Sequence, residues 1–174
     1  LSTPSVLVNN AGIYSSSSFE STTDETWSEQ FHVNLLGSVK ITRACWNIFS
    51  KNNKGSIVNV ASTLGVSPVA HTSAYSAIKA AMINWTMTLA LEGGSKNIRA
   101  NCVSPGIVDT PIHSFHNLNT QQKNEILSQI SQSQVIKKIG QPIDIAKAIY
   151  FLASDESAFT TGINLGVDGG INLK

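Results

Sequence analysis

The amino-acid sequence predicts an α/β fold, a doubly wound parallel sheet with helices on both of its faces. Two observations predict it: short apolar segments alternate along the chain with longer amphipathic ones, and the short segments are mainly apolar rather than strictly alternating. Strands of a parallel sheet are buried on both faces because each crossover connection places a helix over the sheet. Continuous apolar segments therefore favour this class.

The first elements are a strand and a long helix. Residues 5–8 form an apolar segment that a turn at residues 9–12 closes. Residues 22–25, Thr-Thr-Asp-Glu, match a capping box in which Thr is followed three residues later by Glu, so a helix should begin there. Apolar side chains then recur about every fourth residue as far as Ile48.

The later elements continue the alternation. The predicted strands and helices, in order, are a strand at 55–60, an Ala-rich helix at 74–91, a strand at 98–103, a short helix at 121–131 within the polar segment 109–135, a helix at 143–153 and a strand at 163–167. The third strand breaks at a Ser-Pro-Gly turn. Because ligands bind beyond the carboxyl ends of such strands, we expect chemistry in segments 9–12, 61–70 and 104–110.

The composition indicates one globular domain over residues 1–174. The chain is 41% hydrophobic and 13% charged, with a net charge of +1. It has no long run of Lys or Arg and no apolar run near the roughly 18 residues of a membrane-spanning helix. We therefore expect a small-molecule partner, and neither a nucleic acid nor a membrane.

The cysteines and histidines add little chemistry. Cys45 and Cys102 lie in apolar surroundings without the spacing of a disulfide framework, which favours a reducing compartment and a cytoplasmic location. The four histidines make no convincing metal set, so no metal is expected.

Tyr75 and Lys79 stand one turn apart on a predicted helix and therefore on the same face. An ammonium at about 4 Å, with an effective dielectric of about 20, favours the phenolate by on the order of 4 kcal/mol, or roughly three pKa units. That shift would bring the pKa of Tyr75 from about 10 to about 7, where a general acid/base works best. Ser62, just past a strand, could donate a second hydrogen bond to a substrate oxygen and polarise a carbonyl for hydride attack.

Each of these residues also has a purely structural interpretation. Tyr75 and Lys79 could be a packed tyrosine beside a lysine that lies along it, and Ser62 could be a turn residue. Asn34 interrupts an apolar helical stripe and could mark a helix boundary or a local kink. The functional interpretation rests on the combination, which arises by chance less often than any single member.

Taken together, these motifs resemble the short-chain dehydrogenase/reductase family. The matching segments are Asn9-Asn10-Ala11-Gly12, Val33-Asn34-Leu35, Ser62 placed thirteen residues before Tyr75, Tyr75-Ser76-Ala77-Ile78-Lys79, Pro105-Gly106 with Thr110, and residues 144–146, 151–155 and 167–170. They cover nearly the whole chain in the family's order. The resemblance implies a Rossmann-like fold and an oxidoreductase that transfers a hydride between NAD or NADP and an alcohol or carbonyl substrate.

The resemblance also implies a catalytic tetrad. In it, Tyr75 would exchange a proton with the substrate oxygen, and Ser62 would steady that oxygen. Lys79 would lower the pKa of the tyrosine and hold the nicotinamide ribose. Asn34 would hold a water molecule in the proton relay.

Cofactor and substrate contacts follow from the same resemblance. The implied cofactor contacts are Asn10, Ala11 and Gly12 near the adenosine side, Tyr75 and Lys79, and Pro105, Gly106, Val108 and Thr110 beside the nicotinamide and its phosphates. The glycines could equally serve the turns alone. The segment that resembles the family's variable substrate loop adds His113, Phe115 and Leu118 to Ser62 and Tyr75 as implied substrate contacts.

The start of the chain departs from the family's pattern. Family members open with a strand, a glycine-rich turn and a helix that binds the pyrophosphate, whereas this chain begins just before the fourth strand of that pattern. We therefore expect a sheet without the first three strands, with residues 5–8 at an exposed edge. We also expect the parent protein to be an enzyme and this segment alone to be inactive.

Other functions and an assembly remain open at this point. The chain could be an inactive binding module of this fold, or an epimerase or dehydratase that uses the same tyrosine and cofactor. Helices 35–50 and 74–91 carry more apolar surface than one sheet face needs, and the corresponding helices of the family pair between subunits. Small residues would allow close approach, although packing on the helix's own sheet explains them equally: Ala74, Ala77, Ala80 and Ala81. We expect a homo-oligomer, a dimer or a tetramer.

Overall fold

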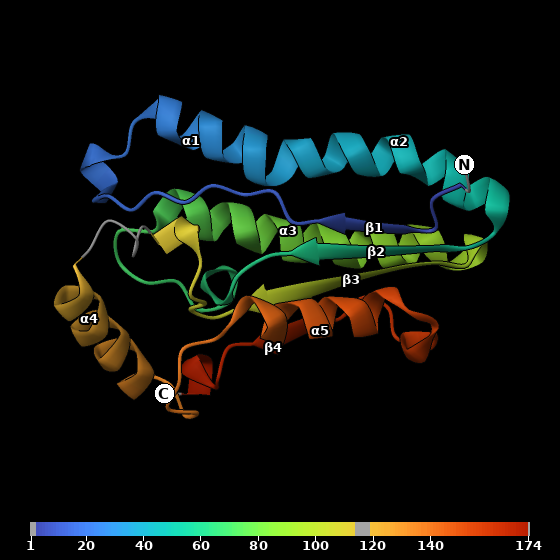
Figure 1. Ribbon diagram of the computed structural model, residues 1–174. Coiled ribbons are helices and arrows are strands. Elements are labelled where there is room, and N and C mark those ends of the chain that lie inside the picture. The colour runs from blue at the N-terminus through green and yellow to red at the C-terminus, as the bar shows by residue number, and fades with distance from the viewer. Residues whose placement is uncertain (1–2, 114–118, 174) are drawn as a thin grey trace.

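The sheet of the computed structural model, which describes residues 3–113 and 119–173, has four parallel strands (Figure 1). These are β1 (Val6–Asn9), β2 (Gly55–Val60), β3 (Ile98–Pro105) and β4 (Asn164–Val167), paired in that spatial order. The predicted α/β class is confirmed. β1 lies at one edge of this sheet, as expected from the sequence.

The helices alternate with the strands. They are α1 (Asp24–Phe31), a π-helical turn (His32–Leu36) that continues directly into α2 (Gly37–Asn52), α3 (Ser73–Gly93), α4 (Thr120–Gln132) and α5 (Pro142–Ala153). Short 3₁₀ segments lie at Phe19–Ser21, Thr63–Gly65, Gly94–Lys96, Pro111–His113, Asp155–Ser157 and Ile171–Leu173. The Thr23 side chain caps α1 by accepting a hydrogen bond from the backbone N–H of Thr26, so the helix begins within the predicted segment 22–25. The predicted capping box of Thr22 with Glu25 is wrong, because the cap is Thr23, one residue later.

Alternate residues of the central strands face opposite layers of helices. Ile57 and Ala100 pack with Phe49 of α2 and Leu89 of α3. Val58, the next residue of β2, faces the opposite layer, where it packs in a cluster with Leu152 of α5. Figure 1 shows α2 and α5 on opposite sides of the sheet. The sheet is therefore covered on both faces, which explains why apolar residues predominate in its central strands and why Asn59 and Asn101 within them are fully buried.

The outer side of α3 carries small residues. Ala74 is buried against the body of the chain, whereas Ala77, Ala80 and Ala81 are exposed. The predicted packing of α3 on its own sheet therefore accounts for Ala74 alone. The homo-oligomer stays a prediction.

A buried polar network ties the sheet to this helical layer. Asn59 Oδ1 accepts a hydrogen bond from Asn9 Nδ2 at 2.7 Å, and Asn59 Nδ2 donates one to the Thr86 hydroxyl at 2.8 Å. Asn9 Nδ2 also donates to the Thr42 hydroxyl at 3.0 Å. Because Asn9 ends β1, this network fixes the point at which the chain leaves the sheet toward residues 10–12.

Candidate active site

The carboxyl edge of the sheet collects the residues that the sequence singles out. Because the strands are parallel, the ends of β1, β2 and β3 meet at one edge, and α3 begins there. Ser62 directly follows β2, and Tyr75 and Lys79 occupy the first two turns of α3. Asn34 lies in the π-helical turn. All four side chains are buried, and only 3% of Lys79 is exposed.

Tyr75, Lys79 and Ser62 lie against one another. The Lys79 ammonium nitrogen is 5.5 Å from the centroid of the Tyr75 ring and donates a hydrogen bond to the Val60 carbonyl at 2.8 Å. The Ser62 hydroxyl lies near the Tyr75 phenol, and its interaction with the phenol lowers the pKa of Tyr75. Ser62 Oγ also accepts a hydrogen bond from the Leu64 N–H at 3.1 Å, which fixes its position at the end of β2. A proton donor, its hydrogen-bonding partner and a positive charge thus share one site.

The pKa of Tyr75 differs from the sequence-based expectation. The pKa of Tyr75 is raised to about 12, mainly because the phenol is buried. Ser62 lowers this pKa by less than burial raises it, and the Tyr14 hydroxyl adds a smaller upward contribution. The expected value near 7 is therefore wrong for this structure. That expectation placed an ammonium at about 4 Å in a partly polar medium, whereas the Lys79 ammonium lies over the ring and is bound to a carbonyl.

Burial also lowers the pKa of Lys79 from 10.5 to about 8, so stability should depend on pH. Above the folded pKa the unfolded chain binds more protons than the folded chain, and the free energy of unfolding rises with pH. We expect a rise of about 1 kcal/mol between pH 8 and 9, measured by denaturant unfolding at a series of pH values. Burial raises the pKa of Cys102 from 9.0 to about 11, which acts in the opposite direction above pH 9 and closes this window.

Two variants separate the contribution of Lys79 from that of other groups. Lys79→Met should remove the rise, whereas Lys147→Met, at an exposed position of α5, should retain it. An equal rise in the wild-type chain and in Lys79→Met would show that the buried ammonium does not cause it.

Asn34 holds the chain segment that follows β1. Its Oδ1 accepts a hydrogen bond from the Ile13 N–H at 2.7 Å, and its Nδ2 donates one to the Ile13 carbonyl at 2.9 Å. The helix is irregular at this position, as one of the sequence interpretations expected, and the irregularity is a π-helical turn. An added Cβ at Gly12 would lie 3.1 Å from Asn34 Oδ1, a tight contact, and 3.7 Å from Lys79 Nζ, an ordinary one, so Gly12 lies directly against both groups. The water-holding role of Asn34 stays a prediction.

The predicted cofactor contacts line the same edge. Asn10, Ala11 and Gly12 are exposed directly after β1. The second set lies at and after the end of β3: Pro105, Gly106, Val108 and Thr110. Val108 is buried and pairs with Gly140 in an isolated bridge, and the Thr110 hydroxyl donates to the Val108 carbonyl at 3.4 Å. Both sets therefore lie at the carboxyl edge of the sheet, one after β1 and the other at and after the end of β3.

Gly65 is a site residue that the sequence interpretation missed. An added Cβ would meet the backbone of Lys79 and Ala80 at 2.8 to 3.0 Å, so the 3₁₀ segment Thr63–Gly65 rests directly on α3 at the position of Lys79. This contact sets the spacing between Ser62 and the tyrosine–lysine pair. The only signal in the sequence is a glycine three residues after Ser62, which is indistinguishable from ordinary turn chemistry.

Tyr14 is a second residue that the sequence interpretation missed. Its ring packs edge-on against Tyr75, with centroids 5.0 Å apart and an interplanar angle of 86°. His113, a predicted substrate contact, also packs against Tyr14, at 6.4 Å between ring centroids. The other two predicted contacts of this loop, Phe115 and Leu118, lie outside the described residues.

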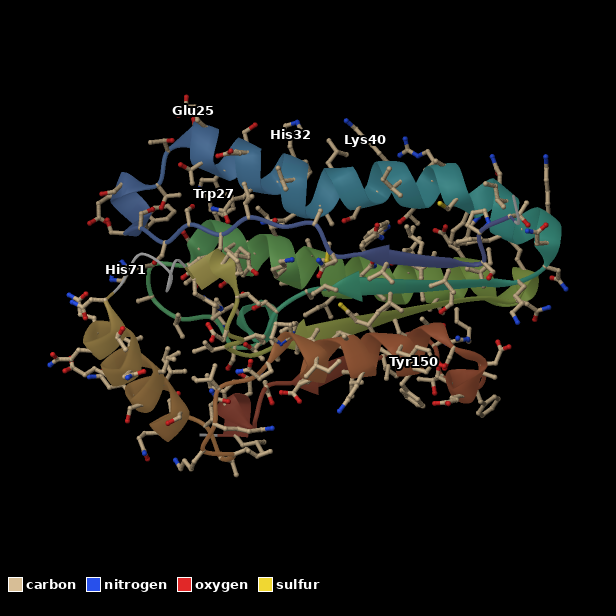
Figure 2. The ribbon with its side chains drawn as sticks, viewed as in Figure 1. Glu25, Trp27, His32, Lys40, His71 and Tyr150 are labelled. Carbon is tan, nitrogen blue, oxygen red and sulfur yellow. The ribbon has the colours of Figure 1, made fainter. Side chains whose placement is uncertain are left out.

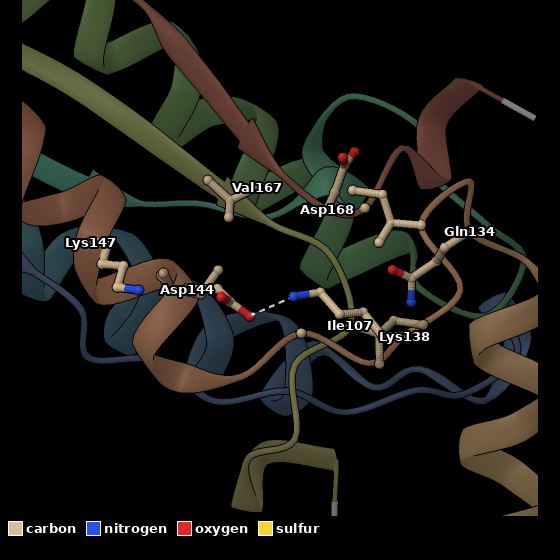
Figure 3. Close-up of a pocket in the computed structure, with 11 residues that line it drawn as sticks. Ile107, Gln134, Lys138, Asp144, Lys147, Val167 and Asp168 are labelled. Carbon is tan, nitrogen blue, oxygen red and sulfur yellow. Dashed lines mark ion pairs between the residues drawn. The ribbon is translucent and has the colours of Figure 1, made fainter.

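A cavity of about 290 Å³ is formed by residues outside the predicted catalytic set (Figure 3). Ile107, Gln134, Asp144 and Asp168 line it, and an ion pair of 4.0 Å joins Lys138 to Asp144 at its rim. None of the four predicted catalytic side chains is among its lining residues. Over residues 3–113 and 119–173, no cluster of His, Cys, Asp or Glu could hold a metal ion, and no helix is long and apolar enough to cross a membrane.

Curated proteins match nearly the whole chain. A family model described as enoyl-(acyl carrier protein) reductase matches residues 2–172. Over 166 residues the chain is 38% identical to a 3-oxoacyl-[acyl-carrier-protein] reductase of Chlamydia trachomatis, covering 95% of this chain and 64% of that protein. It is also 38% identical over 166 residues to an acetoacetyl-CoA reductase of Allochromatium vinosum, covering 95% and 65%. The chain thus spans slightly less than two thirds of the length of these relatives.

Solved structures give the same result. An oxidoreductase of the short chain dehydrogenase/reductase family from Burkholderia thailandensis superposes with a TM-score of 0.91 at 33% identity, covering 99% of this chain and 66% of that one. A 4-hydroxyisoleucine dehydrogenase complexed with NADH gives 0.87 at 31% identity, covering 99% and 70%. The protein ElxO with NADP bound gives 0.89 at 31% identity, covering 98% and 68%.

Proposed function

Because this chain belongs to the short-chain dehydrogenase/reductase family, we propose that it carries the acid/base site of an enzyme that moves a hydride between NAD or NADP and an alcohol or carbonyl substrate. The observation that carries the proposal is the buried contact of Tyr75 with Ser62 and Lys79. The neighbours that bind NADH and NADP support either cofactor. The two reductase relatives favour a ketone as the group that is reduced.

Tyr75 is the proton donor in the direction of reduction. Because burial raises its pKa to about 12, Tyr75 keeps its proton at neutral pH and is ready to donate it. As the carbonyl carbon gains a hydride, the Tyr75 hydroxyl proton passes to the carbonyl oxygen, and an alcohol and a phenolate result. In the oxidation of an alcohol the phenolate takes the proton back. When bound, the nicotinamide supplies or accepts the hydride.

Ser62 and Lys79 stabilise the charge that this transfer develops. The Ser62 hydroxyl, already within hydrogen-bonding reach of Tyr75, donates to the substrate oxygen beside the phenol. The Lys79 ammonium lies 5.5 Å from the centre of the Tyr75 ring and favours the phenolate left by proton loss. Its Val60 hydrogen bond holds the ammonium in place for this role.

The residues at the edge of the sheet fit a nicotinamide cofactor. Gly12 leaves open the space that a Cβ would fill, within 3.7 Å of Lys79 Nζ and beside the Asn34 carboxamide. A ribose hydroxyl is a suitable partner for that ammonium, and residues 10–12 are exposed directly after β1. Pro105, Gly106, Val108 and Thr110 would border the nicotinamide from the end of β3.

Ser62→Ala tests the proposal in the full-length protein. We expect kcat for ketone reduction to fall about 100-fold with little change in KM, because one donor to the developing oxyanion is lost. The measurement follows nicotinamide absorbance with NADH and with NADPH over a panel of simple ketones.

Ser67→Ala is the matched control, since Ser67 is exposed in the loop that follows the same 3₁₀ segment. It should keep wild-type kcat. No ketone-dependent oxidation of either cofactor by the wild-type protein, or equal kcat in Ser62→Ala and Ser67→Ala, would contradict the proposal.

A further inference from the structure

Tyr14 is held firmly at the mouth of the acid/base site. The residue before it, Ile13, has both its backbone N–H and its carbonyl bonded to the buried Asn34 carboxamide, at 2.7 and 2.9 Å. A backbone held at both polar groups leaves little freedom to the next residue. The position of the Tyr14 ring is therefore set by the same π-helical turn that positions Asn34.

The Tyr14 ring packs against the buried phenol and is itself partly exposed. Its edge-on contact with Tyr75, at 5.0 Å between centroids, belongs to the favourable geometry for aromatic pairs. Tyr75 is only 8% exposed, whereas Tyr14 is partly exposed at the same edge of the sheet. His113 packs on Tyr14 from the segment after β3, with the ring planes inclined by 62°. Two chain segments thus bring two more rings to the one that donates the proton.

We propose that Tyr14 and His113 form an aromatic wall of the substrate site, which selects ketones and alcohols that carry a planar ring next to the reacting carbon. The inference rests on the proposed function, since a wall beside Tyr75 contacts the substrate only if Tyr75 exchanges the substrate's proton. A planar ring offers the wall a face or an edge, whereas a saturated ring of the same size offers neither.

The charges around the wall agree with a neutral substrate group. Burial lowers the pKa of His113, more than nearby Asp109 raises it, so the imidazole is uncharged at neutral pH. The wall itself therefore offers no cation to a carboxylate next to the reacting carbon, and the Lys79 ammonium is buried and bonded to the Val60 carbonyl. We therefore expect 2-oxo acids to be poor substrates compared with aryl ketones.

The test compares two probes that differ only in the planarity of the ring, acetophenone and cyclohexyl methyl ketone. Their binding to the full-length protein is measured by saturation-transfer NMR in the presence of cofactor, which requires no turnover. Tyr14→Leu should weaken acetophenone binding about fivefold and change the binding of the saturated probe less than about twofold. Tyr14→Phe, which keeps the ring, should bind both probes as the wild-type protein does.

Phe19→Leu is the control, because Phe19 is an aromatic residue of the same segment that is 75% exposed. It should leave both affinities unchanged. In steady-state assays Tyr14→Leu should raise KM for acetophenone and keep kcat within about twofold of the wild-type value. A general loss of structure would lower kcat as well. If Tyr14→Leu weakened the binding of both probes equally, or if the wild-type protein did not bind acetophenone, the proposed aromatic wall would be wrong. Failure of the proposed function would instead appear as turnover that survives loss of the Tyr75 hydroxyl.

Discussion

Tyr75→Phe should lower kcat of the full-length protein about 1000-fold while leaving cofactor affinity nearly unchanged. The substitution removes one hydroxyl, and with it the proton donor of the proposed reduction, a contribution worth on the order of 100- to 10,000-fold in rate. The ring remains, so its packing against Tyr14 and beneath the Lys79 ammonium is retained. Steady-state absorbance assays give kcat, and fluorescence titration with NADH or NADPH gives the cofactor affinity.

Tyr150→Phe provides the matched control. Tyr150 is 67% exposed on α5, on the side of the sheet opposite α1 and α2, and removal of its hydroxyl should not alter kcat (Figure 2). Circular dichroism of both variants checks that the fold is retained. If Tyr75→Phe reduced ketones at the rate of Tyr150→Phe, the assignment of the proton donor would be untenable.

Gly65→Ala should lower the free energy of unfolding by about 2 kcal/mol and kcat/KM about 100-fold. The added methyl group would lie 2.8 Å from the Lys79 carbonyl carbon and 2.9 Å from the Ala80 nitrogen. Both atoms belong to the backbone of α3, which cannot rotate away as a side chain can. The 3₁₀ segment Thr63–Gly65 must shift instead, and it carries the Ser62 hydroxyl away from Tyr75.

Gly94→Ala shows what a methyl group does where space is open. Gly94 has ordinary helical dihedral angles at the end of α3, and an added Cβ there meets nothing within 4 Å. This variant should be as stable as wild type or more stable by up to about 1 kcal/mol, because alanine restricts the unfolded chain. Denaturant unfolding measures both variants. Similar stability and activity in Gly65→Ala and Gly94→Ala would mean that the contact with α3 does not position Ser62.

Local patterns in the sequence were sufficient to predict the fold. Residues 55–60 are a strand both in the prediction and in the structure, because a short segment with Ile57, Val58 and Val60, closed by a turn, fits a strand buried on two faces. The Thr23 cap, the long helix around Tyr75 and the strand at β3 follow from similarly local chemistry. The third strand runs two residues further than predicted, to Pro105, because that residue pairs with Val167.

The candidate site could be predicted where its geometry is local. Tyr75 and Lys79 share a helix face because they are four residues apart, and the family resemblance, which the comparisons confirm, added Ser62 and Asn34. What depends on distant segments was missed. Tyr14 reaches Tyr75 only after Asn34 holds Ile13, and the pKa of Tyr75 depends on how completely the folded chain removes water from it.

The π-helical turn also keeps two helices in phase. Gln30, Asn34, Ser38 and Thr42 are all buried, and they follow one another at intervals of four residues. In a regular α-helix each such interval rotates the side chain by about 40° beyond a full turn, so three intervals would carry the stripe through about 120°. The wider turn at His32–Leu36 takes up part of that rotation. Deletion of a single residue there would turn α1 by about 100° relative to α2 and swing Asn34 or its neighbours out of the interior.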